Sequence, residues 1–189
     1  MPEAIVNELS DAERLELHEL VFAARRSIRY HNHRRRFFDR FDKFVKISSL
    51  VTGSGAFAAA VATHHHLAIA FSALVALLSA INLVVGPAQA ARLHEELARR
   101  FARLEHDIKR SKEVNSDQLN AFVADRLMIE SDEPPPLRVL DTICHNELCR
   151  ALGYEDCEFY KVDPVQSLFA NFIDLWPWRM KKKCPRNHS

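Results

Sequence analysis

Charged residues are absent from residues 47–91 of this 189-residue chain. Two apolar runs fill that stretch, Ile47–Thr63 and Leu67–Ala91, and only the histidines 64–66 separate them. A helix rises about 1.5 Å per residue and a bilayer's hydrocarbon core is about 30 Å thick, so the first run just reaches across and the second spans it with tilt. We therefore predict a two-pass transmembrane helical hairpin. The alternative is a buried hairpin in a soluble helical bundle, because glycine and alanine make the first run only mildly hydrophobic.

Motifs for catalysis and secretion are also missing. The chain has no Gly-rich phosphate loop, no nucleophile elbow and no His-Glu-x-x-His pattern, so we expect neither enzymatic activity nor a cofactor. Residues 1–17 carry five acids and lack the apolar core of a signal peptide, so the first apolar run should serve as its own insertion signal. No stretch has a convincing strand pattern, which predicts an all-α fold.

Cysteine is scarce, with four residues and no Cys-x-x-Cys. All four follow the apolar runs, on the side where we expect the reducing cytoplasm, so free thiols are predicted. A zinc site could be sought among Cys144, His145, Cys149 and Cys157. However, Cys144 and Cys149 point in different directions on one predicted helix, and we favour packing and no metal site. Histidines 64–66 could bind metal across an oligomer or sense pH, but a plain polar turn is the simpler interpretation.

Basic residues gather at both outer ends of the apolar region. Residues 25–46 contain nine Lys or Arg and two Asp, and residues 92–103 add four arginines. Short Lys/Arg-rich segments stay in the cytoplasm, so both termini are predicted to be cytoplasmic. Residues 29–44 interleave basic and aromatic side chains, as nucleic-acid binders do. Beside a membrane they are more simply explained as topology signals, and we expect no nucleic-acid partner.

Helical signals continue on both sides of the predicted hairpin. A capping box at residues 10–13 begins a helix that should run into the first pass. If the chain turns at the middle histidine, facing positions have numbers that sum to about 129. That register places Ile28 near Phe101 and Ala24 near Leu104, so we predict an antiparallel cytoplasmic stalk.

Four regions and several shorter helices follow from these patterns. Helices are expected at about 117–129 and 137–152, and a last one from Asp163 through Trp176. The predicted regions are an N-terminal amphipathic basic helix (1–46), the transmembrane hairpin (47–91), a cytoplasmic helical region (92–162) and an amphipathic interfacial helix with a basic tail (163–189).

The last predicted helix has the composition of a helix that lies on an anionic membrane surface. It combines an apolar face with tryptophan at its end and a lysine cluster beyond. An equally open alternative is that this face packs on the cytoplasmic helices. The candidate membrane-interface residues are Phe169, Phe172, Trp176, Trp178, Lys181, Lys182 and Lys183.

Polar side chains interrupt the apolar runs at regular positions. Those of the second run are spaced by seven, three and seven residues, which places them on one helical face. Polar groups in hydrocarbon need a partner or water, so this face either packs against another helix or lines a pore. The candidate pore or packing face comprises Ser72, Ser79, Asn82 and Gln89, with Ser48 and Thr52 on the first run.

The predicted elements follow a fixed order along the chain. A basic helix (24–46) comes first, and a two-pass hairpin with a very short turn and an Arg-rich continuation (91–112) follow it. The helical tail then contains Ile143-Cys144-His145-Asn146-Glu147-Leu148 and Leu152-Gly153-Tyr154. This arrangement resembles the SLATT superfamily, bacterial two-transmembrane proteins associated with nucleotide-second-messenger and other antiphage systems. The resemblance implies an oligomeric pore-forming effector in the bacterial inner membrane, triggered by a sensor or nucleotide-signalling partner. The alternative function is a membrane anchor or scaffold whose acidic residues 113–160 recruit a partner.

Overall fold

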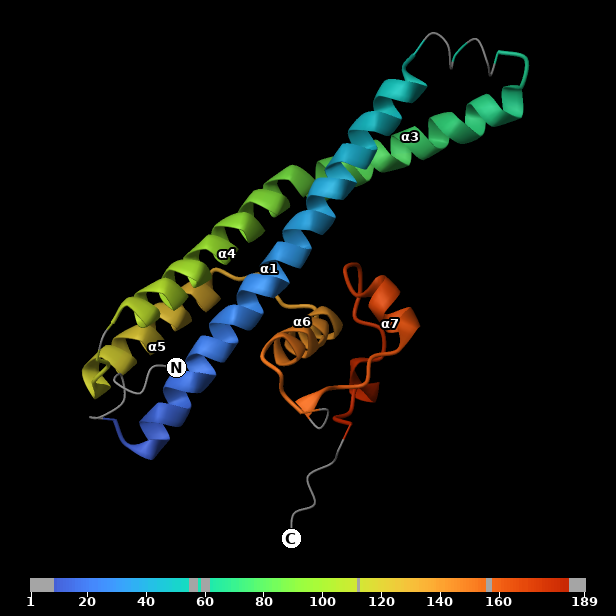
Figure 1. Ribbon diagram of the computed structural model, residues 1–189. Coiled ribbons are helices and arrows are strands. Elements are labelled where there is room, and N and C mark those ends of the chain that lie inside the picture. The colour runs from blue at the N-terminus through green and yellow to red at the C-terminus, as the bar shows by residue number, and fades with distance from the viewer. Residues whose placement is uncertain (1–8, 55–57, 59–61, 112, 156–157, 184–189) are drawn as a thin grey trace. The chain divides into compact units, whose positions relative to one another are not determined.

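The computed structural model describes residues 9–54, 58, 62–111, 113–155 and 158–183 (Figure 1). Within these residues every regular element is helical, which confirms the predicted all-α class, and one isolated antiparallel bridge joins Tyr160 to Lys182. The elements are α1 (Asp11–Thr52), α3 (His65–Val85), α4 (Pro87–Arg110), α5 (Ser116–Ser131), α6 (Arg138–Ala151), α7 (Pro164–Phe169) and the 3-10 helix η3 (Pro177–Arg179).

The chain divides into two compact units. The first, here called the bundle unit, comprises Met1–His33 and Glu95–Ser189, and the second, here called the arm unit, comprises Arg34–His94. Helices α1 and α4 each contribute residues to both units.

The core of the bundle unit is formed by α1, α4 and α5. The predicted capping box begins α1, where the Ser10 N–H donates to Glu13 Oε2 over 2.8 Å. Apolar residues at helical spacing then meet those of α4 and α5, and the largest contributors are Leu17, Leu20, Val21, Ala24, Leu97, Phe101, Leu104, Ile108, Leu119 and Ile129. Ile28 packs against the same cluster, so the residues of the predicted stalk pairs Ile28–Phe101 and Ala24–Leu104 lie in one core.

Histidine and phenylalanine rings stack between α1 and α4. In the bundle unit the ring centroids of His31 and Phe101 lie 5.8 Å apart, and in the arm unit those of Phe38 and His94 lie 5.7 Å apart. Both histidines are buried. In each pair the residue numbers sum to 132, close to the predicted register.

A second cluster of the bundle unit joins α6 to α1 and to the C-terminal segment. It contains Tyr30, Cys144 and Ala170 among its buried members. The Leu137 N–H donates to the Tyr30 hydroxyl, so α1 fixes the chain just before α6 begins. The Asp174 carboxylate then accepts from the first backbone N–H groups of α6, and it thereby caps a helix more than 30 residues earlier in the chain.

The last predicted helix is shorter than the sequence suggested. Asp163 begins α7 as expected, and its N–H donates to Gln166 Oε1. The Gln166 amide also donates to the carbonyls of Leu175 and Trp176, over 2.8 and 3.0 Å, which folds the chain back. The helix ends at Phe169, so the predicted continuation to Trp176 is wrong.

The arm unit contains the end of α1, all of α3 and the start of α4. A break at Gly86-Pro87 separates α3 from α4, because Gly86 has a left-handed φ of 55° that ends α3, and Pro87 is the first residue of α4. Helix α1 ends at Thr52, and most of residues 53–63 lie outside the described part, so a first crossing over Ile47–Thr63 stays a prediction. Among the described residues, one helical stretch, His65–Arg110, is long and apolar enough to cross a membrane.

Candidate functional site

The arm unit holds a groove between α1 and α3. Ser49, Thr52 and Gly53 line one side. The other side is α3, including Ser72 and Val75, and the groove measures about 410 Å³. The Thr52 hydroxyl donates to the Ser48 carbonyl of its own helix over 2.8 Å, so it needs no partner from α3.

The residues of the predicted polar face differ in their exposure and do not all lie on one helix. Ser72 and Ser79 are exposed, whereas Asn82, Ser48 and Thr52 are half-buried. Gln89 lies beyond the break, on α4, and it does not continue the helix that carries the other three. The first apolar run and the second thus both bring polar groups to the arm unit.

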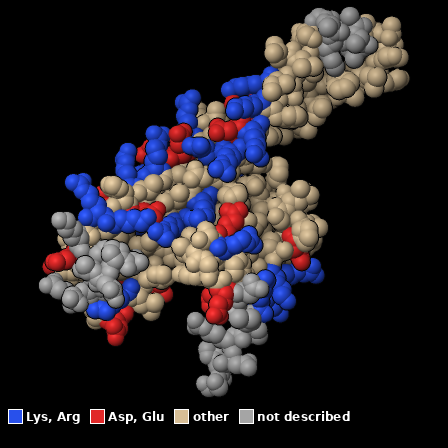
Figure 2. All heavy atoms as spheres, in the orientation of Figure 1, with Lys and Arg blue, Asp and Glu red and all other residues tan. Residues whose placement is uncertain are grey.

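The rest of α3 presents apolar side chains to its surroundings. All of α3 is described, and it contains no buried residue. Leu83 and Val84 are 85% and 84% exposed. Histidines 64–66 are likewise exposed, where α3 begins. In Figure 2 the end of the arm unit carries neither blue nor red atoms.

A second apolar surface lies on the C-terminal segment of the bundle unit. The predicted interface residues Phe169, Phe172, Trp176 and Trp178 are all exposed, although they form a folded segment and not one helix. Val165, Leu168 and Ile173 are exposed beside them. We call these seven residues the C-terminal patch.

The lysines after this patch are partly engaged. Lys182 Nζ lies 2.9 Å from Glu158 Oε2, and Lys183 Nζ lies 5.4 Å from the centroid of the Phe159 ring. Arg179 lies over Trp176 at 5.5 Å, and Lys181 is exposed. Basic charge therefore borders the patch, but only part of the predicted lysine cluster is directed to solvent.

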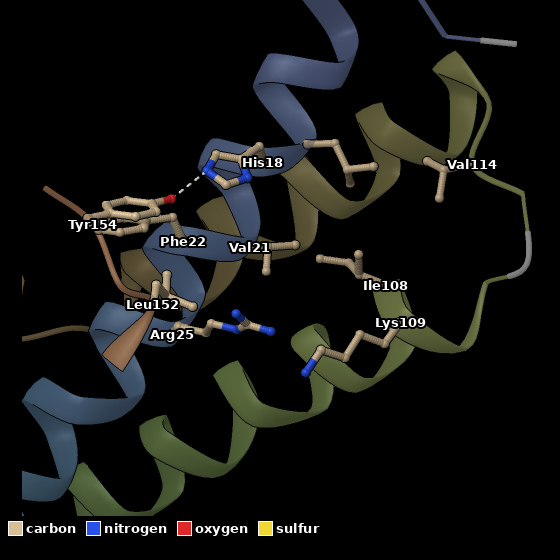
Figure 3. Close-up of a pocket in the computed structure, with 10 residues that line it drawn as sticks. His18, Val21, Phe22, Arg25, Ile108, Lys109, Val114, Leu152 and Tyr154 are labelled. Atoms are coloured by element: carbon tan, nitrogen blue, oxygen red, sulfur yellow. Dashed lines mark hydrogen bonds between the residues drawn. The ribbon is translucent and has the colours of Figure 1, made fainter. Parts of the chain in front are cut away.

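The bundle unit also contains a cavity of about 470 Å³ (Figure 3). Its walls are mostly apolar, from Leu17, Val21, Ile108, Val114 and Leu152. The side chains of Arg25 and Lys109 approach it from one side, and both bind Glu105, at 2.7 and 2.6 Å. Burial raises the pKa of Glu105, but the hydrogen bonds from Lys109 and Arg25 outweigh it and leave that pKa below its ordinary value.

Aromatic residues close another side of this cavity. His18 Nε2 lies 2.9 Å from the Tyr154 hydroxyl, and the rings of Phe22 and Tyr154 stack with centroids 6.0 Å apart. Apolar walls with a few converging polar groups are typical of small-molecule sites. The sequence pattern missed it, because its residues come from α1, α4 and the loop after α6.

The cysteines that the structure describes, Cys144 and Cys149, are buried free thiols, as predicted. Burial raises the pKa of Cys144 to about 12, so the free thiol is protonated at neutral pH. Cys149 Sγ lies 3.4 Å from His145 Nε2, while Cys157 and Cys184 fall outside the described residues.

No protein-family model, curated protein or solved structure was found to match this chain. The resemblance to the SLATT superfamily therefore stays a prediction.

Proposed function

We propose that this chain is an integral membrane protein whose arm units assemble into an oligomer that permeabilises the bacterial inner membrane. It would act as an effector of a defence system, triggered by a sensor or nucleotide-signalling partner. The observation that carries the proposal is the open apolar surface of α3, where no residue is buried and Leu83 and Val84 are 85% and 84% exposed. Contiguous surfaces of this kind mark membrane or protein contacts.

The dimensions of α3 support lipid as its surrounding. Its 21 residues extend roughly 32 Å at about 1.5 Å each, which matches a hydrocarbon core of about 30 Å. Transferring one fully exposed leucine out of water contributes about 1.5–3 kcal/mol, so leaving a whole helix face in water is costly. Charged residues stop at Lys46 on α1 and resume at Arg92 on α4, which supports both termini lying in the cytoplasm.

The polar side chains of α3 favour an assembly over a single inserted chain. Ser72 and Ser79 are exposed in one copy and would face hydrocarbon there. A neighbouring arm unit or a water path would cover both. Asn82 is half-buried, and its amide would need a partner or water in hydrocarbon as well.

The scaffold alternative is less well supported, because acidic side chains of residues 113–160 already pair with the chain's own basic residues. Four such contacts span 2.6 to 3.2 Å: Arg100–Asp132, Arg26–Asp141, His31–Glu133 and His33–Glu147. Arg100 and Arg26 neutralise two of these acids, and His31 and His33 contact the other two by hydrogen bonds, so all four are less available to recruit a partner.

Replacing Asn82 with Leu tests the pore. We expect the wild-type protein to arrest growth on overexpression and to conduct in planar bilayers, and Asn82→Leu to lose both while its membrane insertion and oligomer size stay unchanged. The matched control is Val84→Leu, on the opposite side of α3, which should keep both activities. Loss of the oligomer in Asn82→Leu would make this residue a packing contact. Absence of arrest and conductance in the wild-type protein, with its genomic partners present, would leave the scaffold function.

A further inference from the structure

Three side chains with different donor atoms meet in the bundle unit. Cys144 and Glu147 are three residues apart on α6, so they share one face, and His33 reaches them from α1. His33 Nε2 lies 3.1 Å from Glu147 Oε2, and the nitrogen, sulfur and carboxylate oxygen all lie within 4.8 Å of one another.

The three side chains differ in exposure in a way that suits a bound ion. Cys144 is fully buried and forms the floor, whereas the side chains of His33 and Glu147 are 32% and 38% exposed. An ion can therefore approach from solvent past His33 and Glu147 and bind the Cys144 sulfur, which is shielded from water. Access of this kind is one of the requirements for a credible metal site.

We propose that His33, Cys144 and Glu147 bind one Zn²⁺ ion, with solvent as the fourth ligand. Imidazole, thiolate and carboxylate are the zinc donors of proteins, with bonds of about 2.0–2.3 Å and tetrahedral geometry. Such bonds place neighbouring donor atoms roughly 3.5 Å apart. Side-chain rotations that move the donor atoms by about 1 Å would bring them to this spacing.

Charge balance supports the same ion. Zn²⁺ would displace the thiol proton of Cys144 to solvent, and the thiolate and the Glu147 carboxylate together would neutralise the two positive charges of the ion. The site would then carry no net charge, which suits surroundings in which Asp141 and the guanidinium groups of Arg29 and Arg26 all act electrostatically on Cys144.

The neighbouring donors on α6 form a different group. His145 Nε2 lies 3.1 Å from the Glu158 carbonyl and 3.4 Å from Cys149 Sγ, so this nitrogen is engaged outside the group of His33, Cys144 and Glu147. Variants of these two residues therefore serve as matched controls on the same helix.

The test uses Co²⁺ as a spectroscopic probe for Zn²⁺, with the purified full-length chain in mild detergent. Cys157 and Cys184 are replaced by serine to remove background thiols. We expect one Co²⁺ per chain, with tetrahedral d–d bands and a thiolate charge-transfer band that Zn²⁺ bleaches. Cys144→Ser should abolish the charge-transfer band, and His33→Ala should weaken Zn²⁺ binding by about 100-fold or more, since even outer-shell losses cost 10–100-fold.

The control variants Cys149→Ser and His145→Ala should bind as the parent protein does. Each variant is first checked by circular dichroism, so that misfolding is not scored as lost binding. A parent protein that shows no thiolate band, or a band that survives Cys144→Ser, would overturn the site. A band lost only in Cys149→Ser would assign the metal to the other donor group.

Discussion

Asp174 stabilises α6 from a distance, and its removal should destabilise the bundle unit measurably. The residue before α6, Leu137, has no side chain that can cap a helix, and α6 gains its cap from Asp174 through bonds to the N–H groups of Arg138 and Val139 at 2.9 and 3.0 Å. In Asp174→Ala these two N–H groups lose their partner, as does the interaction of a carboxylate with the helix N-terminus.

The size of the effect follows from the two bonds. Losing a side-chain cap costs about 0.5–2 kcal/mol, and a hydrogen bond to a charged group contributes about 1.5–3 kcal/mol. Because Asp174 is only half-buried and water can replace it in part, we expect about 2 kcal/mol for Asp174→Ala. At roughly 2–4 °C per kcal/mol for a chain of this size, Tm should fall by about 4–8 °C. Asp174→Asn keeps an acceptor and should lose about half as much.

Thermal unfolding in mild detergent, followed by circular dichroism, measures this change. The control is Asp117→Ala, which removes an exposed acid from the first turn of α5, a helix that already has the side-chain cap of Asn115. The control should shift Tm much less. Equal Tm values for Asp174→Ala and Asp117→Ala would refute the capping role, as would an Asp174→Asn variant no more stable than Asp174→Ala.

Three further predictions concern pH, lipid and topology. Hydrogen bonds from Ser116 first and Ser10 second lower the pKa of Glu13 to about 2, so its stabilisation is complete above the ordinary carboxyl pKa of 4.5 and is lost as pH falls toward 2. Glu13→Gln should therefore flatten the dependence of Tm on pH across that window, and an unchanged slope would count against these bonds. Both tryptophans of the chain lie in the C-terminal patch, so brominated anionic lipids should quench the fluorescence of proteoliposomes if the patch meets the membrane, less so at high salt; the absence of quenching would indicate protein packing. A single cysteine at His65, in a background without native cysteines, should react with an impermeant reagent in intact spheroplasts, and protection there would invert the predicted topology.

Local signals were the predictable part of the fold. The capping box at residues 10–13 lies where the sequence suggested, because it depends on residues within one helical turn. The pairing of α1 with α4 was also predictable, since both helices carry apolar residues at helical spacing and these residues meet in one core.

Long-range polar contacts were not predictable. The end of α7 depends on Gln166 binding carbonyls nine and ten residues later, which helical periodicity does not record. The cavity and the group of His33, Cys144 and Glu147 combine residues more than 100 positions apart. The spacing of the cysteines suggested Cys149 as the second donor beside Cys144. In the structure, the donor side chains grouped with Cys144 are Glu147 on α6 and His33 on α1.

The stacked rings limit how residues can be inserted into α1 and α4. On α1 a histidine precedes a phenylalanine by seven residues, His31 and Phe38, and on α4 His94 precedes Phe101 by the same interval. Because the helices are antiparallel, each histidine meets the phenylalanine of the other helix. An insertion in one helix alone would break one pair or both, whereas matched insertions of seven residues would restore the same facing positions. Related chains should therefore differ in the lengths of these two helices together, in steps of one heptad.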